Sequence, residues 1–186
     1  MLMNVPNMLT MLRLFLVPVL FYALVEGRYG WALAIFLIAS VSDGLDGWIA
    51  RRFHQQTRLG AILDPIADKL LVVTAVITLT WLGFLPLWLT VLIISRDLLI
   101  IGGSMAYQLL IGAIEIAPTR LSKVNTVVQF LLIVLVLIHT ASGWQYPDLL
   151  MIFIIASFAS TLSSGLQYVW VWSRKATAQE KGTTGP

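Results

Sequence analysis

Four aspartates with helical spacing stand out in a chain that has few charged residues. Asp43 and Asp46 are three residues apart, and Asp64 and Asp68 are four apart. Each pair therefore shares one face if its segment is helical. Four carboxylates held close together repel one another unless protons or cations neutralise them. Hard divalent cations such as Mg²⁺, Mn²⁺ and Ca²⁺ prefer all-oxygen ligands, so the spacing predicts a divalent-metal site.

The composition indicates a membrane protein. Hydrophobic residues make up 59% of the 186 residues and charged residues only 11%, whereas a soluble domain is about 25% charged. This excludes an ordinary soluble domain, a disordered chain and a nucleic-acid-binding module. The absence of cysteine excludes thiolate metal sites and disulfides. An aspartate inside a membrane helix costs roughly 2.5–3.5 kcal/mol on insertion scales, so acids in such helices indicate function.

Six apolar stretches are long enough to cross a bilayer, which takes about 20 mostly apolar residues. They are approximately Met8–Val25, Trp31–Ala50, Leu59–Leu82, Leu85–Leu110, Leu121–Thr140 and Leu149–Trp172. We therefore expect an all-α integral membrane protein with six transmembrane helices, forming a single domain over residues 1–186. The segment Met1–Asn7 is expected to lie along the membrane interface, and Ser173–Pro186 to form a flexible tail.

Basic residues are distributed unevenly between the two sides of these spans. One side carries only Arg28. The other side carries nine basic residues, Arg13, Arg51, Arg52, Arg58, Arg120, Lys123, Arg174, Lys175 and Lys181. Because basic segments stay in the cytosol, both termini are predicted to be cytosolic. The aspartate pairs then lie near the cytosolic ends of the second and third spans.

Glycines and arginines accompany the aspartates. Gly44, Gly47 and Gly60 leave room for a ligand or a neighbouring backbone, and at Gly44 we prefer helix packing. Arg51 and Arg52 follow the first pair at the depth of lipid headgroups, where a guanidinium suits phosphate oxygens. For Arg52 we prefer the interpretation of a positive-inside anchor. The alternative for the aspartates is a structural role as polar contacts between helices.

The segment from Asp43 to Asp68 resembles the signature of the CDP-alcohol phosphatidyltransferase family, D-x2-D-G-x2-A-R-x8-G-x3-D-x3-D. Its eight fixed positions are all matched, by Asp43, Asp46, Gly47, Ala50, Arg51, Gly60, Asp64 and Asp68. The resemblance implies a six-helix transmembrane enzyme with cytosolic termini, which agrees with the spans and the charge distribution.

The resemblance also implies a reaction. Two divalent cations, Mg²⁺ or Mn²⁺, would sit among the aspartates and hold the diphosphate of CDP-diacylglycerol. An acceptor hydroxyl would attack the phosphate that bears the lipid, and CMP would leave. Asp43, Asp46 and Asp64 would be metal ligands, and Asp68 would be the general base and a further ligand. Phosphoryl transfer requires mainly positioning and charge neutralisation, which such a site supplies.

Further expectations follow from the same resemblance. Gly47, Ala50, Arg51 and Gly60 would shape the nucleotide site. The partners would be CDP-diacylglycerol, an alcohol acceptor and the bilayer, with no nucleic acid. The family tends to be homodimeric, and residues 102–104, Gly-Gly-Ser, would let helices of two subunits approach, with packing inside one chain as the alternative. The implied location is a bacterial inner or plasma membrane, or the mitochondrial inner membrane of a eukaryote, with the site at the cytosolic face.

Two later segments bear on the acceptor. Phosphatidylglycerophosphate synthases usually carry Arg-Glu in the fourth span with a further arginine two turns on, and Gly-Lys-x-Lys-Thr at the start of the fifth. This chain has Arg96-Asp97, with Ser104 at the second arginine's position, and Ser122-Lys123. Two basic residues expected around the phosphate of glycerol-3-phosphate are therefore missing. This favours phosphatidylglycerol as the acceptor and resembles the cardiolipin synthase branch.

Other interpretations stay open. The stretch Gln56–Ala61 is more similar to the phosphatidylglycerophosphate synthase branch, whose acceptor is glycerol-3-phosphate. Arg96 and Lys123 are candidate acceptor contacts in either case, although Arg96 would alternatively pair with an acid on a neighbouring helix. A metal or proton transporter is the alternative from another class, because intramembrane carboxylates also serve transport. Against it, no internal repeat is visible and the acids lie toward the cytosolic end.

Overall fold

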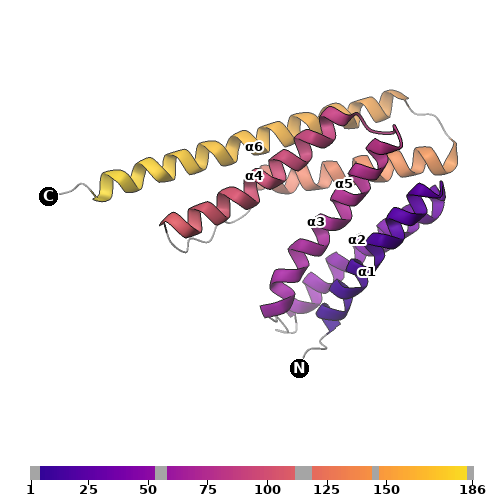
Figure 1. Cartoon of the computed structure of the whole chain (residues 1–186), viewed down its shortest axis with the longest axis horizontal. Coiled ribbons are helices and arrows are strands. Elements are labelled where there is room, and N and C mark those ends of the chain that lie inside the picture. The colour runs from indigo at the N-terminus through magenta and orange to yellow at the C-terminus, as the bar shows by residue number, and fades with distance from the viewer. Residues whose placement is uncertain (1–4, 53–57, 112–118, 144–146, 184–186) are drawn as a thin grey trace. The chain divides into compact units, whose positions relative to one another are not determined.

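The computed structural model consists of helices joined by short connections (Figure 1). It describes the backbone of residues 5–52, 58–111, 119–143 and 147–183, and the side chains of residues 8–42, 66–103, 119–143 and 147–171. The helices are α1 Val5–Val25, α2 Tyr29–Arg52, α3 Arg58–Trp81, α4 Leu87–Ile111, α5 Arg120–Ser142 and α6 Pro147–Thr183. These six helices match the six predicted segments, and the described residues include no strand.

The two ends of the helical region lie further out than the sequence suggested. α1 begins at Val5, inside the segment expected to lie along the interface. α6 continues through Ser173 to Thr183, where a flexible tail was expected to begin at Ser173. Long apolar runs therefore located the helices well, but they did not show that the polar residues after the last run also continue the helix.

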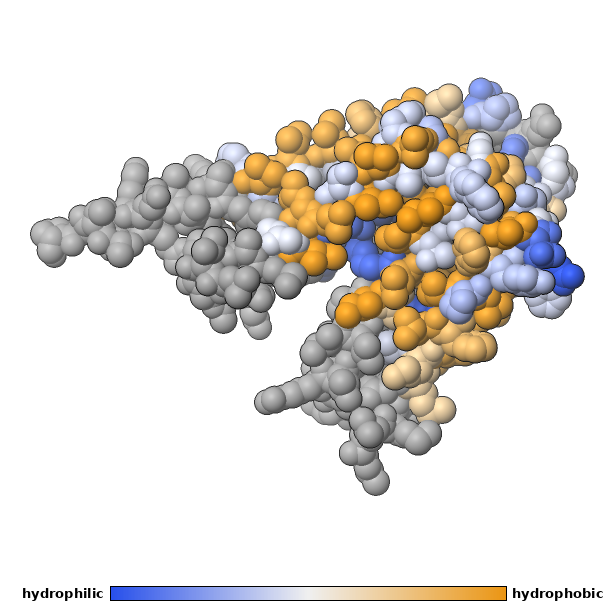
Figure 2. Space-filling view, in the orientation of Figure 1, coloured by the Kyte–Doolittle hydropathy of each residue, from blue (hydrophilic) through white to orange (hydrophobic). Residues whose placement is uncertain are grey.

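Three helices are long and apolar enough to cross a membrane among the described residues, with spans at Met8–Val25, Arg120–Ser142 and Pro147–Val171. A shorter apolar helical stretch covers Tyr29–Ser42. Large apolar side chains are exposed on all six helices, and many of them are visible in Figure 2. Contact with lipid rather than water accounts for this exposure. The chain is therefore an integral membrane protein.

The helices divide into two compact units, each described here by itself. The first consists of Met1–Pro86 and Phe130–Leu150, and the second of Leu87–Gln129 and Met151–Pro186. In the first unit, α1 packs against both α2 and α3, and α2 also contacts α3. The interior of this unit is filled by buried alanines and by the ring of Phe36. The Phe36 ring stacks on Phe130, with the ring centroids 5.6 Å apart.

A glycine ends α1 and reverses the chain. Gly27 has φ of 70°, a left-handed conformation that residues with a Cβ avoid. The N–H of Arg28 then donates to the carbonyl of Ala23 at 2.9 Å, which completes a Schellman motif. Gly83 ends α3 in the same way, with φ of 83°. The stop at Gly27 allows α2 to return alongside α1, and α1, α2 and α3 lie side by side in alternating directions (Figure 1).

The second unit contains α4, the first part of α5 and most of α6. Trp88 of α4 meets Phe158 of α6 edge to face, with the ring centroids 5.6 Å apart. Leu89 and Ile93 of α4 are fully buried. Further along these helices many of the buried side chains are polar or charged, which is unusual for helices that are otherwise apolar. They include Arg96, Asp97, Asn125, Gln129, Ser157, Thr161 and Ser164.

Candidate functional site

The family-like signature lies on two helices that contact each other. Asp43 and Asp46 occupy the last turns of α2, and Asp64 and Asp68 the first turns of α3. Both segments are helical, so the three- and four-residue spacings place each pair on one helix face, as the sequence predicted. The side chains at 43–65 lie outside the described residues. The roles of Asp43, Asp46, Gly47, Ala50, Arg51, Gly60 and Asp64 therefore stay predictions.

The backbone places the two pairs at similar depth. At about 1.5 Å per residue, Asp46 lies roughly 9 Å before the end of α2, and Asp64 lies roughly 9 Å after the beginning of α3. The two helices contact each other and run in opposite directions (Figure 1). Residues 46 and 64 thus lie at equal distances along their helices from the connection between α2 and α3, and carboxylates there would suit a hard divalent cation.

Asp68 is the one signature aspartate whose side chain is described. It is half-buried, next to half-buried Lys69. Its neighbours on the helix, Ala67 and Leu71, are buried in the packed face of α3. Asp68 thus lies at the border between the helix interior and the surface, where a carboxylate can meet both a substrate and water.

Arg13 corrects one assignment made from sequence. It was counted among the basic residues that set the orientation of the spans, but it lies inside α1 and its side chain is fully buried. Thr10, one turn earlier, is buried on the same face. Because α1 packs against α2 and α3, this cation belongs to the same three helices as the aspartates. The available signal was its position within an apolar span, where a charge indicates function.

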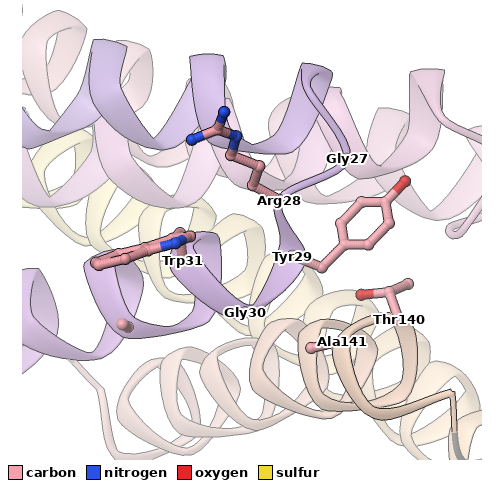
Figure 3. Close-up of a pocket in the computed structure, with 8 residues that line it drawn as sticks. Gly27, Arg28, Tyr29, Gly30, Trp31, Thr140 and Ala141 are labelled. Carbon is pink, nitrogen blue, oxygen red and sulfur yellow. The ribbon is translucent and has the colours of Figure 1, made fainter.

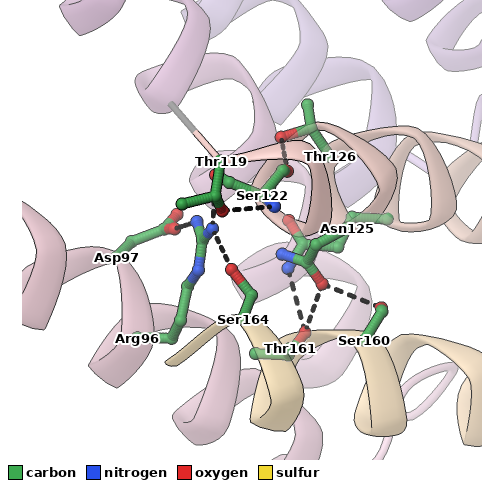
Figure 4. Close-up of polar contacts among 10 residues, drawn as sticks. Arg96, Asp97, Thr119, Ser122, Asn125, Thr126, Ser160, Thr161 and Ser164 are labelled. Carbon is green, nitrogen blue, oxygen red and sulfur yellow. Dashed lines mark hydrogen bonds and ion pairs between the residues drawn. The ribbon is translucent and has the colours of Figure 1, made fainter. Parts of the chain in front are cut away.

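A second polar cluster occupies the interior of the second unit (Figure 4). The guanidinium of Arg96 donates from Nη1 to Asp97 Oδ1 at 2.8 Å, and from Nη2 to Ser122 Oγ and to Ser164 Oγ, both at 2.7 Å. The ring of Tyr168 lies against it, with the ring centroid 5.9 Å from Cζ. Arg96 thus ties α4 to α5 and α6, and its charge is offset by a buried carboxylate.

An ion pair of Arg96 with an acid on a neighbouring helix was the alternative expected from the sequence. The pair exists, but its acid is Asp97, the next residue on the same helix. Lys123, the other candidate acceptor contact, directly follows Ser122, yet its side chain is exposed. The structure therefore brings Ser122, and not the Lys123 side chain, into the Arg96 cluster.

A row of polar side chains that was not predicted from the sequence continues from this cluster. Asn125 Oδ1 accepts from Ser160 Oγ at 2.9 Å and from Thr161 Oγ1 at 2.8 Å, and Gln129 Nε2 donates to Thr161 Oγ1 at 3.2 Å. The signal was present as helical spacing, because Ser122, Asn125 and Gln129 share one face of α5. The sequence did not show that this face of α5 packs against the hydroxyl groups of Ser160 and Thr161 on α6.

A pocket of about 650 Å³ opens at the other end of α2 (Figure 3). Its lining comes from the turn after α1, the first turns of α2 and the end of α5, namely Gly27, Arg28, Tyr29, Gly30, Trp31, Ala34, Thr140 and Ala141. Tyr29 and Asp43 are separated by about 21 Å along the helix axis at 1.5 Å per residue. This pocket is therefore separate from the signature, and it contains none of the predicted site residues.

Comparison with known proteins identifies the family. The model of the CDP-alcohol phosphatidyltransferase family matches residues 3–171. A human (Homo sapiens) cardiolipin synthase (CMP-forming) is 34% identical over 192 residues, covering 95% of this chain and 63% of its own length. A Streptomyces coelicolor cardiolipin synthase (CMP-forming) is 38% identical over 105 residues, covering 53% of this chain and 49% of its own.

A third relative comes from the other branch considered from sequence. A probable phosphatidylglycerophosphate synthase of Mycobacterium tuberculosis is 46% identical over 103 residues, covering 51% of this chain and 48% of its own length. The chain thus spans from about half to just under two thirds of the length of these relatives. The family match covers nearly all of it, and the chain belongs to the CDP-alcohol phosphatidyltransferase family.

Proposed function

We propose that this protein transfers a phosphatidyl group from CDP-diacylglycerol to the hydroxyl of an acceptor alcohol and releases CMP. The observation that carries the proposal is the complete signature, Asp43 to Asp68, on two contacting helices of a family member. The names of the cardiolipin synthase relatives, which are CMP-forming, support the same reaction.

Asp43, Asp46 and Asp64 are the metal ligands in this proposal, with Asp68 as base and further ligand. Two divalent cations, Mg²⁺ or Mn²⁺, would neutralise the diphosphate and the charge that develops on the departing CMP. The donor set supports this choice, because four carboxylates without sulfur or imidazole suit hard cations. Arg51, with its planar guanidinium, contacts the nucleotide phosphates, and Gly47, Ala50 and Gly60 leave space beside them.

The transfer itself is one substitution at phosphorus. The acceptor oxygen forms a bond to the phosphorus that carries the diacylglycerol, and the bond from that phosphorus to the CMP oxygen breaks. The hydroxyl proton passes to the carboxylate of Asp68, whose half-buried position supports the role of proton acceptor. The acyl chains stay in lipid while the nucleotide reaches water, so the site lies at a membrane–water interface. The excess of basic residues supports the cytosolic face of a bacterial inner or plasma membrane, or the corresponding face of a mitochondrial inner membrane.

Phosphatidylglycerol is the proposed acceptor, which makes the protein a cardiolipin synthase. The similarity to the human relative over 95% of this chain supports this choice. So does the lack of two basic residues that a terminal phosphate would need. Arg96 and Lys123 are the proposed acceptor contacts. A homodimer is proposed as well, because a side chain at Gly102 would meet open space where a second helix could approach.

Glycerol-3-phosphate is the second candidate acceptor. The 46% identity to the mycobacterial phosphatidylglycerophosphate synthase relative favours it over about half of the chain. The stretch Gln56–Ala61 also favours glycerol-3-phosphate, because it is more similar to the phosphatidylglycerophosphate synthase branch. In this case the protein would be a phosphatidylglycerophosphate synthase with the same metal site and the same general base.

One assay tests both the transferase reaction and the identity of the acceptor. The purified protein in detergent is supplied with CDP-diacylglycerol, Mg²⁺ or Mn²⁺, and either phosphatidylglycerol or glycerol-3-phosphate, and CMP release and the lipid product are measured. We expect CMP and cardiolipin with phosphatidylglycerol, and none after removal of the cation by a chelator. A lipid product from glycerol-3-phosphate alone would establish the second candidate, and no CMP with any acceptor alcohol would exclude the enzyme.

A further inference from the structure

The pocket at the beginning of α2 belongs to a single unit of the chain. All of its lining residues lie in Met1–Pro86 or Phe130–Leu150, which form the first unit. Its volume of about 650 Å³ is typical of sites that bind small molecules or head groups. Because Asp43 lies about 21 Å further along the axis of α2, the pocket is near the membrane surface opposite to the signature.

The charge of this pocket is positive. Among the described residues that line it, Arg28 is the one with a charged side chain. The guanidinium is exposed and forms no hydrogen bond or ion pair with another described residue. Glu26, two residues earlier, does not line the pocket. The N-terminal end of α2 adds a partial positive charge to that of the guanidinium. The pocket therefore attracts an anion and offers no carboxylate to a cation.

The orientation of the spans does not explain Arg28. Basic residues concentrate on the side of a membrane protein that stays in the cytosol. Nine basic residues are expected on that side, and Arg28 is the single one expected on the other. A cation on the side where the orientation rule disfavours it indicates a local role, and the pocket supplies the place for one.

An apolar stripe leads from the pocket along α2. Trp31 and Ala34 line the pocket, and Ile38 and Val41 follow on the same helix face. Trp31, Ile38 and Val41 are 68%, 56% and 59% exposed. An acyl chain can lie against this stripe while a phosphate stays at the pocket. A free anion would leave the stripe unused, so the stripe favours a lipid as the ligand.

The remaining polar groups of the pocket suit a head group that carries hydroxyls. Figure 3 shows Arg28 and Trp31 extending to one side of the beginning of α2, with Tyr29 and Thr140 on the other side. The Thr140 hydroxyl donates to carbonyls of its own helix at 2.9 and 3.1 Å, so its oxygen can only accept from a ligand. The Tyr29 ring is held edge to face by Phe84, with the centroids 5.4 Å apart.

We propose that this pocket binds an anionic phospholipid in the leaflet opposite to the signature. The phosphate contacts the guanidinium of Arg28, a head-group hydroxyl donates to Thr140 Oγ1, and an acyl chain lies along the apolar stripe. Phosphatidylglycerol represents this class of lipid, because it combines one negative charge with free hydroxyls and has no cation. The pocket is separate from the aspartates, so the proposal does not depend on the transferase reaction.

A general attraction between a basic side chain and anionic head groups is the competing explanation. That attraction needs the charge of Arg28 but not the space beside Gly30. A Cβ at Gly30 would have no atom within 4 Å, so a larger side chain there extends into the open space of the pocket. Gly30→Leu therefore separates the two explanations, because it fills the pocket and leaves the charge in place.

The test counts the lipids bound to the purified protein by native mass spectrometry from detergent. Phosphatidylglycerol, phosphatidylethanolamine and inorganic phosphate are titrated separately, without CDP-diacylglycerol or divalent cations. The variants are Arg28→Gln, which removes the cation, and Gly30→Leu. Arg120→Gln is the matched control, because Arg120 is also an exposed arginine at the beginning of a helix and lies outside the pocket.

We expect the native chain to bind phosphatidylglycerol about tenfold more tightly than phosphatidylethanolamine. Arg28→Gln and Gly30→Leu should each weaken phosphatidylglycerol binding about tenfold, the effect of losing one charge-assisted contact, and Arg120→Gln should bind it like the native chain. Without lipid all three should keep the native melting temperature, since each position is exposed.

Three results would overturn the proposal. Native affinity in Gly30→Leu would leave only the general attraction of a basic side chain. Equal affinity for the two lipids would remove the assignment to an anionic head group. Tighter binding of inorganic phosphate than of phosphatidylglycerol would make the pocket a site for a free anion.

Discussion

Arg96 and Asp97 form an ion pair between consecutive residues of α4, with Nη1 and Oδ1 2.8 Å apart. Consecutive side chains on a helix point in different directions, so the long arginine side chain must bend back to reach its neighbour. The carboxylate thereby stays with the cation on one helix. Nη2 is left to reach Ser122 on α5 and Ser164 on α6, and neither of those helices has to supply an acid.

Asp97→Asn is expected to destabilise the protein by about 3 kcal/mol, because it leaves the Arg96 guanidinium buried without a countercharge. The apparent free energy of unfolding in detergent, measured by denaturant titration, checks this. Asp148→Asn is the control, since Asp148 is exposed in the first turn of α6. Equal effects of the two substitutions would show that the carboxylate of Asp97 does not stabilise Arg96.

Arg13→Met is expected to lower the free energy of unfolding by about 3 kcal/mol, because the fully buried guanidinium has an interaction partner in the structure and removing one member of a buried charged contact is destabilising. Arg13→Lys should recover part of the loss, since lysine keeps the charge but not the planar fork of donors. Arg28→Met, at an exposed position in the turn before α2, should have little effect. The same denaturant titration compares all three. If Arg13→Met matched Arg28→Met, the buried cation would have no structural or electrostatic role.

Asp68→Asn is expected to reduce kcat by a factor of about 10²–10⁴, the usual contribution of a general base. In the proposed mechanism the affinity for CDP-diacylglycerol should change little, because Asp43, Asp46 and Asp64 would still hold the two cations. Steady-state CMP release and direct binding of CDP-diacylglycerol separate the two effects. Glu26→Gln, at an exposed acid after α1, is the control. Loss of binding would make Asp68 primarily a metal ligand, and an unchanged kcat would exclude it as the base.

The sequence by itself determined the helices and the family to which the chain belongs. Apolar runs of about 20 residues report membrane helices directly, because lipid requires every backbone polar group to bond within its own segment. The helical state of residues 43–52 and 58–68 confirms the assumption on which the aspartate spacing depended. The signature needed only local spacing, so a single sequence was sufficient to recognise it.

Only the tertiary structure decided which polar residues lie inside the helix packing. Arg13 was interpreted as an orientation signal until its burial between helices was known. Asn125 and Thr161 are 36 residues apart along the chain, and Arg96 and Ser164 are 68 apart. The local pattern of either segment does not encode such a contact. The spacing of residues predicts which side chains share a helix face, but it does not predict which other helix packs against that face.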